Sequence, residues 1–156
     1  MTKAPRRGAR AVRLPALRLE VVDRGRPRTP LPLLRRVVRA TLAFARRPSL
    51  SVSLLLTDDA EIADLHARHL GDPTPTDVMS FALDDGAEVV VSVTTAARIA
   101  RERGHAVGAE VALYVVHGLL HVLGHDDTTP RARARMRDAE RTVLARTGLV
   151  VSPVDA

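Results

Sequence analysis

The 156-residue sequence contains no cysteine and no tryptophan, and its aromatic side chains are one tyrosine and two phenylalanines. Without cysteine the chain has no disulfide partner, and any metal ion must be bound by His, Asp or Glu. With so few aromatic rings, platforms for stacking nucleic-acid bases are not expected. The core must therefore consist of aliphatic side chains.

Long apolar runs are also missing. No stretch approaches the roughly 18 residues that cross a bilayer, and the basic N-terminus is not followed by an apolar block with a cleavage site. We therefore expect a cytoplasmic protein with no membrane partner.

Lysine is almost absent, because Lys3 is the only one and the formal charge of +6 comes from arginine. Arginine makes bidentate contacts with phosphate, so RNA is a plausible partner. A compositional preference for arginine over lysine explains the charge equally well. Charge alone does not separate these two interpretations.

The composition divides the chain into three parts. Residues 1–15 are rich in Arg, Ala and Pro without periodicity, which predicts a disordered basic arm. Residues 16–150 contain no repeat and no internal linker, so we expect one domain there. Residues 151–156 form a tail.

Apolar periodicity predicts four strands and five helices. The predicted strands cover residues 17–22, 51–56, 78–81 and 88–93, and the predicted helices cover residues 32–47, 59–70, 94–103, 107–123 and 130–146. An irregular loop is expected at 71–75. This order indicates an α+β fold, in which a small mixed four-stranded sheet packs against about five helices.

Two histidines lie four residues apart in an apolar run. His117 and His121 share one face of the predicted helix 107–123, where a purely structural core has little reason to bury adjacent imidazoles. Gly124 then allows the chain to turn back and supply another ligand. Two imidazoles, one further protein ligand and an open position are typical of a catalytic zinc ion. The sequence therefore predicts a metal-dependent hydrolase domain over residues 16–150, with its metal site on a central helix.

The third ligand depends on how this helix ends. If the helix continued, His125 would lie on the same face, one turn further on. If Gly124 breaks the helix, Asp127 is better placed, and we expect Asp127. Asp126 is a candidate to accept a hydrogen bond from an imidazole.

The zinc-peptidase signature has a glutamate directly after its first histidine, as general base. Gly118 stands at that position. Another group would have to accept the proton, and Glu88, Asp126 and Glu110 are candidates. For Glu110 we favour a salt-bridged helix position, and the catalytic residues stay unknown.

Several blocks resemble the YbeY family, bacterial endoribonucleases that mature ribosomal RNA. Residues 117–127 resemble its pattern His-Gly-x-Leu-His-Leu-x-Gly-Tyr-Asp-His, and residues 75–81 resemble Pro-Thr-Asp-Val-Leu-Ser-Phe. Residues 88–92 are similar to its strand Gly-Asp-Ile-x-Ile-Ser, and Glu110 occupies its usual acidic position. Together these blocks span about residues 16–150.

The resemblance implies a single Zn²⁺ ion held by His117, His121 and Asp127. It also implies a zinc-dependent, single-strand-specific endoribonuclease in small-subunit ribosomal RNA maturation and ribosome quality control. Its partners would be that RNA or ribosomal particles. Asp127 stands where the family usually has His, and His125 where it usually has Tyr.

Other residues are candidates for contacts around the site. His69 and Leu70 stand where the family has Tyr-Arg, so a phosphate contact there comes from Arg68 or is absent. Arg98 and Arg101 would either hold the RNA backbone or form a solvated face. Asp77 is expected to brace the cleft.

Two alternative functions are compatible with the motif. One is a metallopeptidase-like hydrolase, which the missing glutamate and the basic charge disfavour. The other is a ribosome-associated RNA-binding factor whose metal is structural. In that case, nuclease activity would be insensitive to the substitution His117→Ala.

Overall fold

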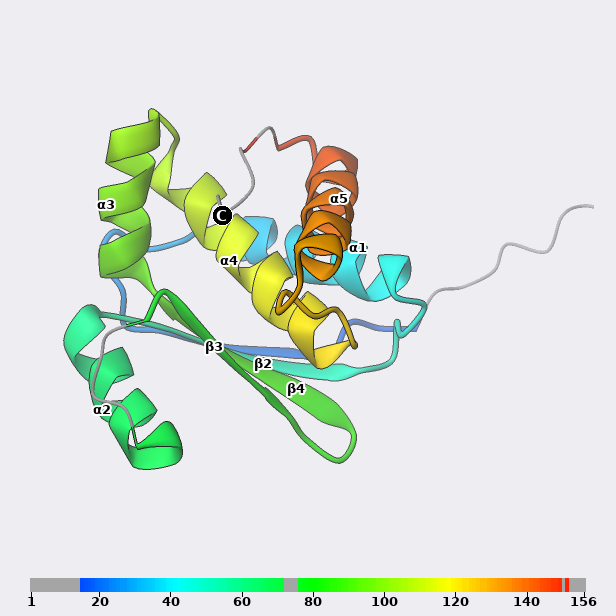
Figure 1. Ribbon diagram of the computed structural model, residues 1–156, viewed down its shortest axis with the longest axis horizontal. Coiled ribbons are helices and arrows are strands. Elements are labelled where there is room, and N and C mark those ends of the chain that lie inside the picture. The colour runs from blue at the N-terminus through cyan, green and yellow to red at the C-terminus, as the bar shows by residue number, and fades with distance from the viewer. Residues whose placement is uncertain (1–14, 72–75, 150, 152–156) are drawn as a thin grey trace, which may run out of the picture.

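The computed structural model describes residues 15–71, 76–149 and 151. Nearly all of the predicted basic arm lies outside these residues, as do positions 72–75 of the predicted loop and 152–156 of the predicted tail. The described residues form an α+β fold with five helices and one mixed four-stranded sheet, as the sequence predicts (Figure 1).

The sheet has the strand order β1 (Leu19–Asp23), β2 (Ser51–Thr57), β4 (Gly86–Ser92) and β3 (Val78–Ala82). Strands β1, β2 and β4 are parallel, and β3 runs antiparallel to β4. Helix α1 (Leu31–Phe44) makes the crossover from β1 to β2, because parallel neighbours cannot be joined by a tight turn. The short β3–β4 connection forms a hairpin.

Four helices follow: α2 (Asp59–Leu70), α3 (Val93–Arg103), α4 (Val107–Val122) and α5 (Pro130–Arg146). Helix α4 lies across one face of the sheet, with α1, α3 and α5 packed beside it (Figure 1). Ten of its residues are buried, because its apolar side chains surround the whole helix. The predicted metal site is therefore carried by the central helix of the fold.

The two faces of the sheet carry separate apolar clusters. Val89 and Val91 belong to the main core together with the buried residues of α4. Val90, which lies between them on β4, packs instead with Ile62 of α2. Successive side chains of a strand point to opposite faces, so α2 covers the face away from α4.

Local side-chain chemistry sets the element boundaries. Asp58 accepts a hydrogen bond from the Glu61 amide at the start of α2. The Ser92 hydroxyl accepts one from the Thr95 amide, so α3 begins at Val93 and the predicted strand 88–93 ends one residue early. The same strand begins at Gly86, two residues before its predicted start. The predicted helix 32–47 ends at Phe44, because Arg46 takes a left-handed conformation with φ 58°.

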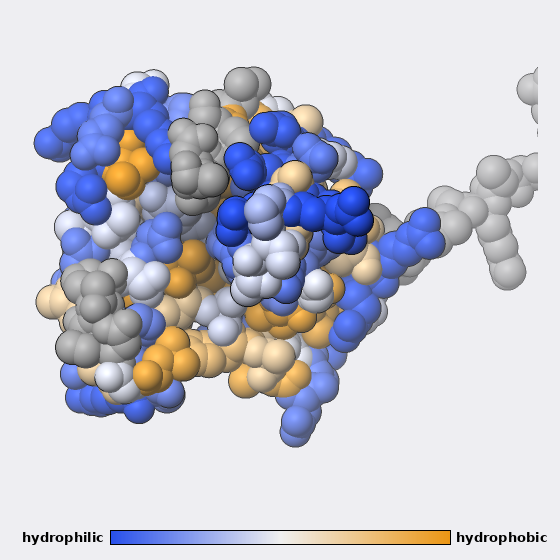
Figure 2. All heavy atoms as spheres, in the orientation of Figure 1, coloured by the Kyte–Doolittle hydropathy of each residue, from blue (hydrophilic) through white to orange (hydrophobic). Residues whose placement is uncertain are grey.

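The face shown in Figure 2 is hydrophilic over α5 and more apolar along the β3–β4 hairpin. Leu83, in that hairpin, is 51% exposed. No single helix in the described parts of the chain is long and apolar enough to cross a membrane. Helices α3 and α4 reach the required length and composition only as a pair, and the chain bends by 119° between them.

Candidate metal centre

The end of helix α4 turns the chain back toward its own histidines. The Gly124 amide donates to the His121 carbonyl, and the His125 amide donates to the Leu120 carbonyl over 2.8 Å. This pair of hydrogen bonds is a Schellman motif, which requires a residue in the left-handed conformation just after the helix. Gly124 supplies it with φ 102°, so the helix breaks where the sequence predicts.

The turn brings three side chains together. His117 Nε2 and His121 Nε2 lie 3.1 Å apart. Asp127 Oδ2 lies 3.8 Å from the first nitrogen and 3.4 Å from the second. Among the described residues, this is the group of His, Asp and Glu side chains that could hold a metal ion. We call it the metal group.

The dimensions of the metal group fit a small divalent ion. In the plane of the two nitrogens and the Asp127 oxygen, the point equidistant from all three atoms lies about 2.0 Å from each of them. Zinc bonds to nitrogen and oxygen measure about 2.0–2.2 Å. The two nitrogens repel unless a proton or a cation lies between them, and the Asp127 carboxylate beside them favours positive charge at this point. The residues present therefore fit a metal ion.

Glu140 of α5 fixes the orientation of the first histidine. Its Oε1 lies 2.6 Å from His117 Nδ1, and Glu140 is 1% exposed. A proton held on Nδ1 by this carboxylate leaves the Nε2 lone pair directed at the metal group. Burial lowers the pKa of His117, but the hydrogen bond and charge of Glu140, with Asp127 and Asp77, raise it above its ordinary value.

Glu140 is a residue of this site that was not predicted from the sequence. A signal was present: Met136, Glu140 and Val143 share one face of α5, and all three are buried. A glutamate on the apolar face of an otherwise basic helix needs a partner. The sequence alone, however, does not say that this partner is a histidine 23 residues away.

The metal group is open on one side. The His117 side chain is 15% exposed, that of His121 is 32% exposed and that of Asp127 is 41% exposed. Three protein ligands with a solvent-facing side leave space for a water molecule or a substrate atom. Structural zinc sites, in contrast, are usually closed by four protein ligands.

Gly118 explains why the peptidase glutamate is missing. A Cβ atom at this position would lie 2.8 Å from Val89 Cγ1 and 3.1 Å from Val78 Cγ2. Helix α4 therefore rests directly on β3 and β4 between the two histidines. No glutamate fits there without moving the helix away from the sheet.

The remaining residues near the turn have other partners. The His125 ring packs against Phe44, with 6.2 Å between the ring centroids, and lies outside the metal group. The Asp126 carboxylate accepts hydrogen bonds from the amide and hydroxyl of Thr128, and these bonds lower its pKa. Glu140, rather than Asp126, is the carboxylate that orients an imidazole.

Glu88 and Glu110 are separated from the metal group. Glu88 alternates with Val89 on β4, so it points to the face away from α4. Glu110 is fully buried, with Arg103 at 3.6 Å and His105 at 3.9 Å. The salt-bridged position favoured for Glu110 is confirmed. Burial raises the pKa of Glu110, and its neighbours Arg103, Tyr114 and His105 only partly offset this.

The residues predicted to contact RNA near the site are distributed over several elements. Arg68 pairs with Asp64 at 3.0 Å on α2, and Arg98 pairs with Glu102 at 3.8 Å on α3. Phosphate contacts by these arginines stay predictions. The Asp77 carbonyl accepts a hydrogen bond from the Ser92 amide, which ties the start of β3 to the end of β4.

Fold and site together define a small α+β protein whose His-His-carboxylate group is able to bind a metal ion. A sequence profile of the family described as Endoribonuclease YbeY matches residues 29–148. The chain belongs to the YbeY endoribonuclease family.

Individual relatives agree with this assignment. The chain is 38% identical over 133 residues to the endoribonuclease YbeY of Desulforamulus reducens, covering 76% of this chain and 87% of that protein. It is 39% identical over 114 residues to the endoribonuclease YbeY of Moorella thermoacetica, covering 63% and 73%. A solution structure of a Thermotoga maritima protein is similar, with a TM-score of 0.62 and 22% identity over 83% of this chain and 88% of the other. At that identity, the likeness shows the fold alone.

Proposed function

We propose that this protein is a zinc-dependent endoribonuclease that cleaves single-stranded RNA. The observation that carries the proposal is the convergence of His117, His121 and Asp127 on one point at zinc-bonding distance. Membership of a family whose relatives are named endoribonucleases supports RNA as the substrate.

His117, His121 and Asp127 would hold the ion. Two imidazoles and a carboxylate around an open position are a catalytic zinc set. When bound, zinc polarises a phosphoryl oxygen and makes water more acidic. Glu140 keeps the Nδ1 proton of His117 in place, so that Nε2 stays available as a ligand.

For the biological role, we propose small-subunit ribosomal RNA maturation and ribosome quality control, in the cytoplasm. The substrate would be ribosomal RNA, free or within ribosomal particles. The basic charge supports this, since each neutralised phosphate adds to the affinity for RNA. We further propose that residues 16–150 act as one hydrolase domain.

Cleavage assays with unstructured RNA and with casein test this proposal. The double variant His117→Ala/His121→Ala should lose both bound zinc and RNA cleavage, while His66→Ala on α2 keeps both. Casein cleavage that needs His117 would replace the proposal with a peptidase. RNA cleavage that persists in the metal-free double variant would contradict catalysis by the metal group.

A further inference from the structure

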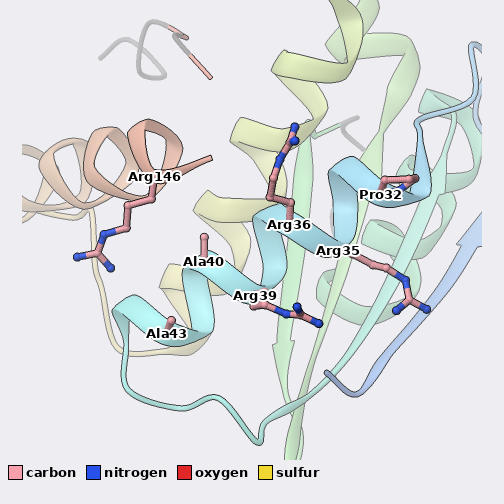
Figure 3. A pocket seen from close by; sticks show the side chains of 7 residues that line it. All are labelled: Pro32, Arg35, Arg36, Arg39, Ala40, Ala43 and Arg146. Carbon is pink, nitrogen blue, oxygen red and sulfur yellow. The ribbon is translucent and has the colours of Figure 1, made fainter. Parts of the chain in front are cut away.

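We propose that the exposed arginines of helix α1, together with Arg146 at the end of α5, bind the sugar-phosphate backbone of the RNA outside the metal group. The identity of this polyanion rests on the proposed function. Arg35, Arg36, Arg39 and Arg146 surround a shallow hollow of about 510 Å³ (Figure 3). We call these four residues the α1 arginine surface.

The charge of this region is one-sided. Between Asp23 and Asp58 the sequence contains eight arginines and no acidic residue. Outside α1, exposed arginines such as Arg24 and Arg141 are paired with carboxylates at 2.6 Å and 3.0 Å. Within the described parts of the chain, none of the three α1 arginines forms an ion pair. Their positive charge is therefore available to an external anion.

The packing of α1 fixes the direction of these side chains. Leu34, Val37, Val38, Thr41 and Leu42 are the buried residues of the helix. The arginines project from its exposed side, and Arg35 and Arg39 are one helical turn apart, a rise of about 6 Å. This is comparable to the separation of successive phosphates on an RNA strand.

The lining of the hollow favours the backbone of RNA over its bases. Ala40 and Ala43 lie between the arginines, so no bulky side chain blocks an approaching phosphate. Among the described residues, no aromatic side chain lines the hollow, which leaves bases without a stacking partner. Arginine forks match phosphate oxygens bidentately, and such contacts position RNA without reading its sequence.

A chain of contacts links the α1 arginine surface to the metal group. The Arg146 guanidinium lies over the Phe44 ring, 5.5 Å from its centroid. Phe44 also packs against the ring of His125, which precedes Asp127 by two residues. An RNA strand cut at the metal group can therefore continue over this loop onto α1, and this continuity favours RNA over an anionic membrane.

Salt-dependent binding tests this inference. The triple variant Arg35→Gln/Arg36→Gln/Arg39→Gln is compared with the control Arg24→Gln/Arg28→Gln/Arg141→Gln, whose arginines all face carboxylates. The probe is a long 2′-O-methyl RNA, which resists cleavage, followed by fluorescence anisotropy. Loss of three phosphate contacts should reduce the slope of log K against log salt by about 2, at roughly 0.7 per contact. The control should keep the slope of the unaltered protein.

Further readouts keep this inference separate from the proposed function. The triple variant should cleave a short RNA normally and a long RNA with a higher KM. Replacing the three arginines by lysine should restore most of the salt slope. Two results would overturn the inference. One is an unchanged salt slope in the glutamine variant. The other is a glutamine variant that no longer binds phosphatidylserine vesicles but still binds RNA like the unaltered protein. Absence of cleavage by the unaltered protein would instead refute the proposed function, while the binding comparison still stands.

Discussion

His117 Nδ1 and Glu140 Oε1 lie 2.6 Å apart, and this contact joins the central helix α4 to the C-terminal helix α5. The carboxylate is buried and holds one ring nitrogen, while the other ring nitrogen faces His121 and Asp127. The packing of α5 against α4 therefore sets the ring orientation in which His117 Nε2 can bind a metal ion.

We predict that Glu140→Gln weakens zinc binding by about 10–100-fold, as loss of an outer partner of a metal ligand commonly does. The amide has a similar shape but lacks the negative charge that stabilises the required ring orientation. Competition with a fluorescent zinc chelator measures the affinity. Asp138→Asn, on the exposed side of α5, is the control and should bind zinc like the unaltered protein. Equal affinities for all three proteins would contradict the role of Glu140.

Asp127 and His125 are distinguished by a second pair of variants. Asp127→Asn removes a ligand of the ion itself. It should therefore reduce zinc affinity by more than Glu140→Gln, for which about 10–100-fold is expected. His125→Gln should leave it nearly unchanged, because the His125 ring packs against Phe44. Isothermal titration of the metal-free proteins with zinc makes the comparison. A larger loss of zinc affinity in the His125 variant than in the Asp127 variant would show that Asp127 is not the third ligand.

Gly118→Ala should lower the free energy of unfolding by about 1–3 kcal/mol, the usual cost of overpacking a core. The new methyl group would lie 2.8 Å from Val89 Cγ1. Gly108→Ala is the matched control in the same helix, where the nearest contact is a flexible Leu33 Cδ2 at 3.3 Å. Urea denaturation gives both values. Equal stabilities would show that α4 can move away from the sheet without cost.

Glu110 makes stability depend on pH in a defined direction. Burial raises its pKa in the folded state, so the folded protein holds this proton more tightly than the unfolded chain does. Its contribution to stability is present below the unfolded pKa and is lost as pH rises through the raised folded pKa. The free energy of unfolding of Glu110→Gln, relative to the unaltered protein, should therefore increase from about pH 4 to pH 7. A difference that shrinks over this range would contradict the prediction.

The sequence predicts the features of this fold that depend on local spacing. His117 and His121 share a helix face because they are four residues apart, and Gly124 breaks the helix because it alone of its neighbours tolerates a positive φ. Helices α2 and α5 have their predicted bounds, since Asp58 and Thr129 are strong N-caps.

Features that depend on packing between distant segments could not be predicted. The Glu140 contact is set by the packing of α5 on α4, and no sequence spacing encodes it. The close approach of Val89 to Gly118 likewise depends on how α4 crosses the sheet. The contacts between Arg146, Phe44 and His125 join three elements, α5, α1 and the turn after α4.

The most direct test of the metal group is the zinc content of the purified protein after zinc loading and removal of free metal. Elemental analysis should find one zinc ion per chain in the unaltered protein and none above background in His117→Ala/His121→Ala. The same zinc content in both proteins, or none in either, would contradict the claim that these two imidazoles and Asp127 hold a metal ion together.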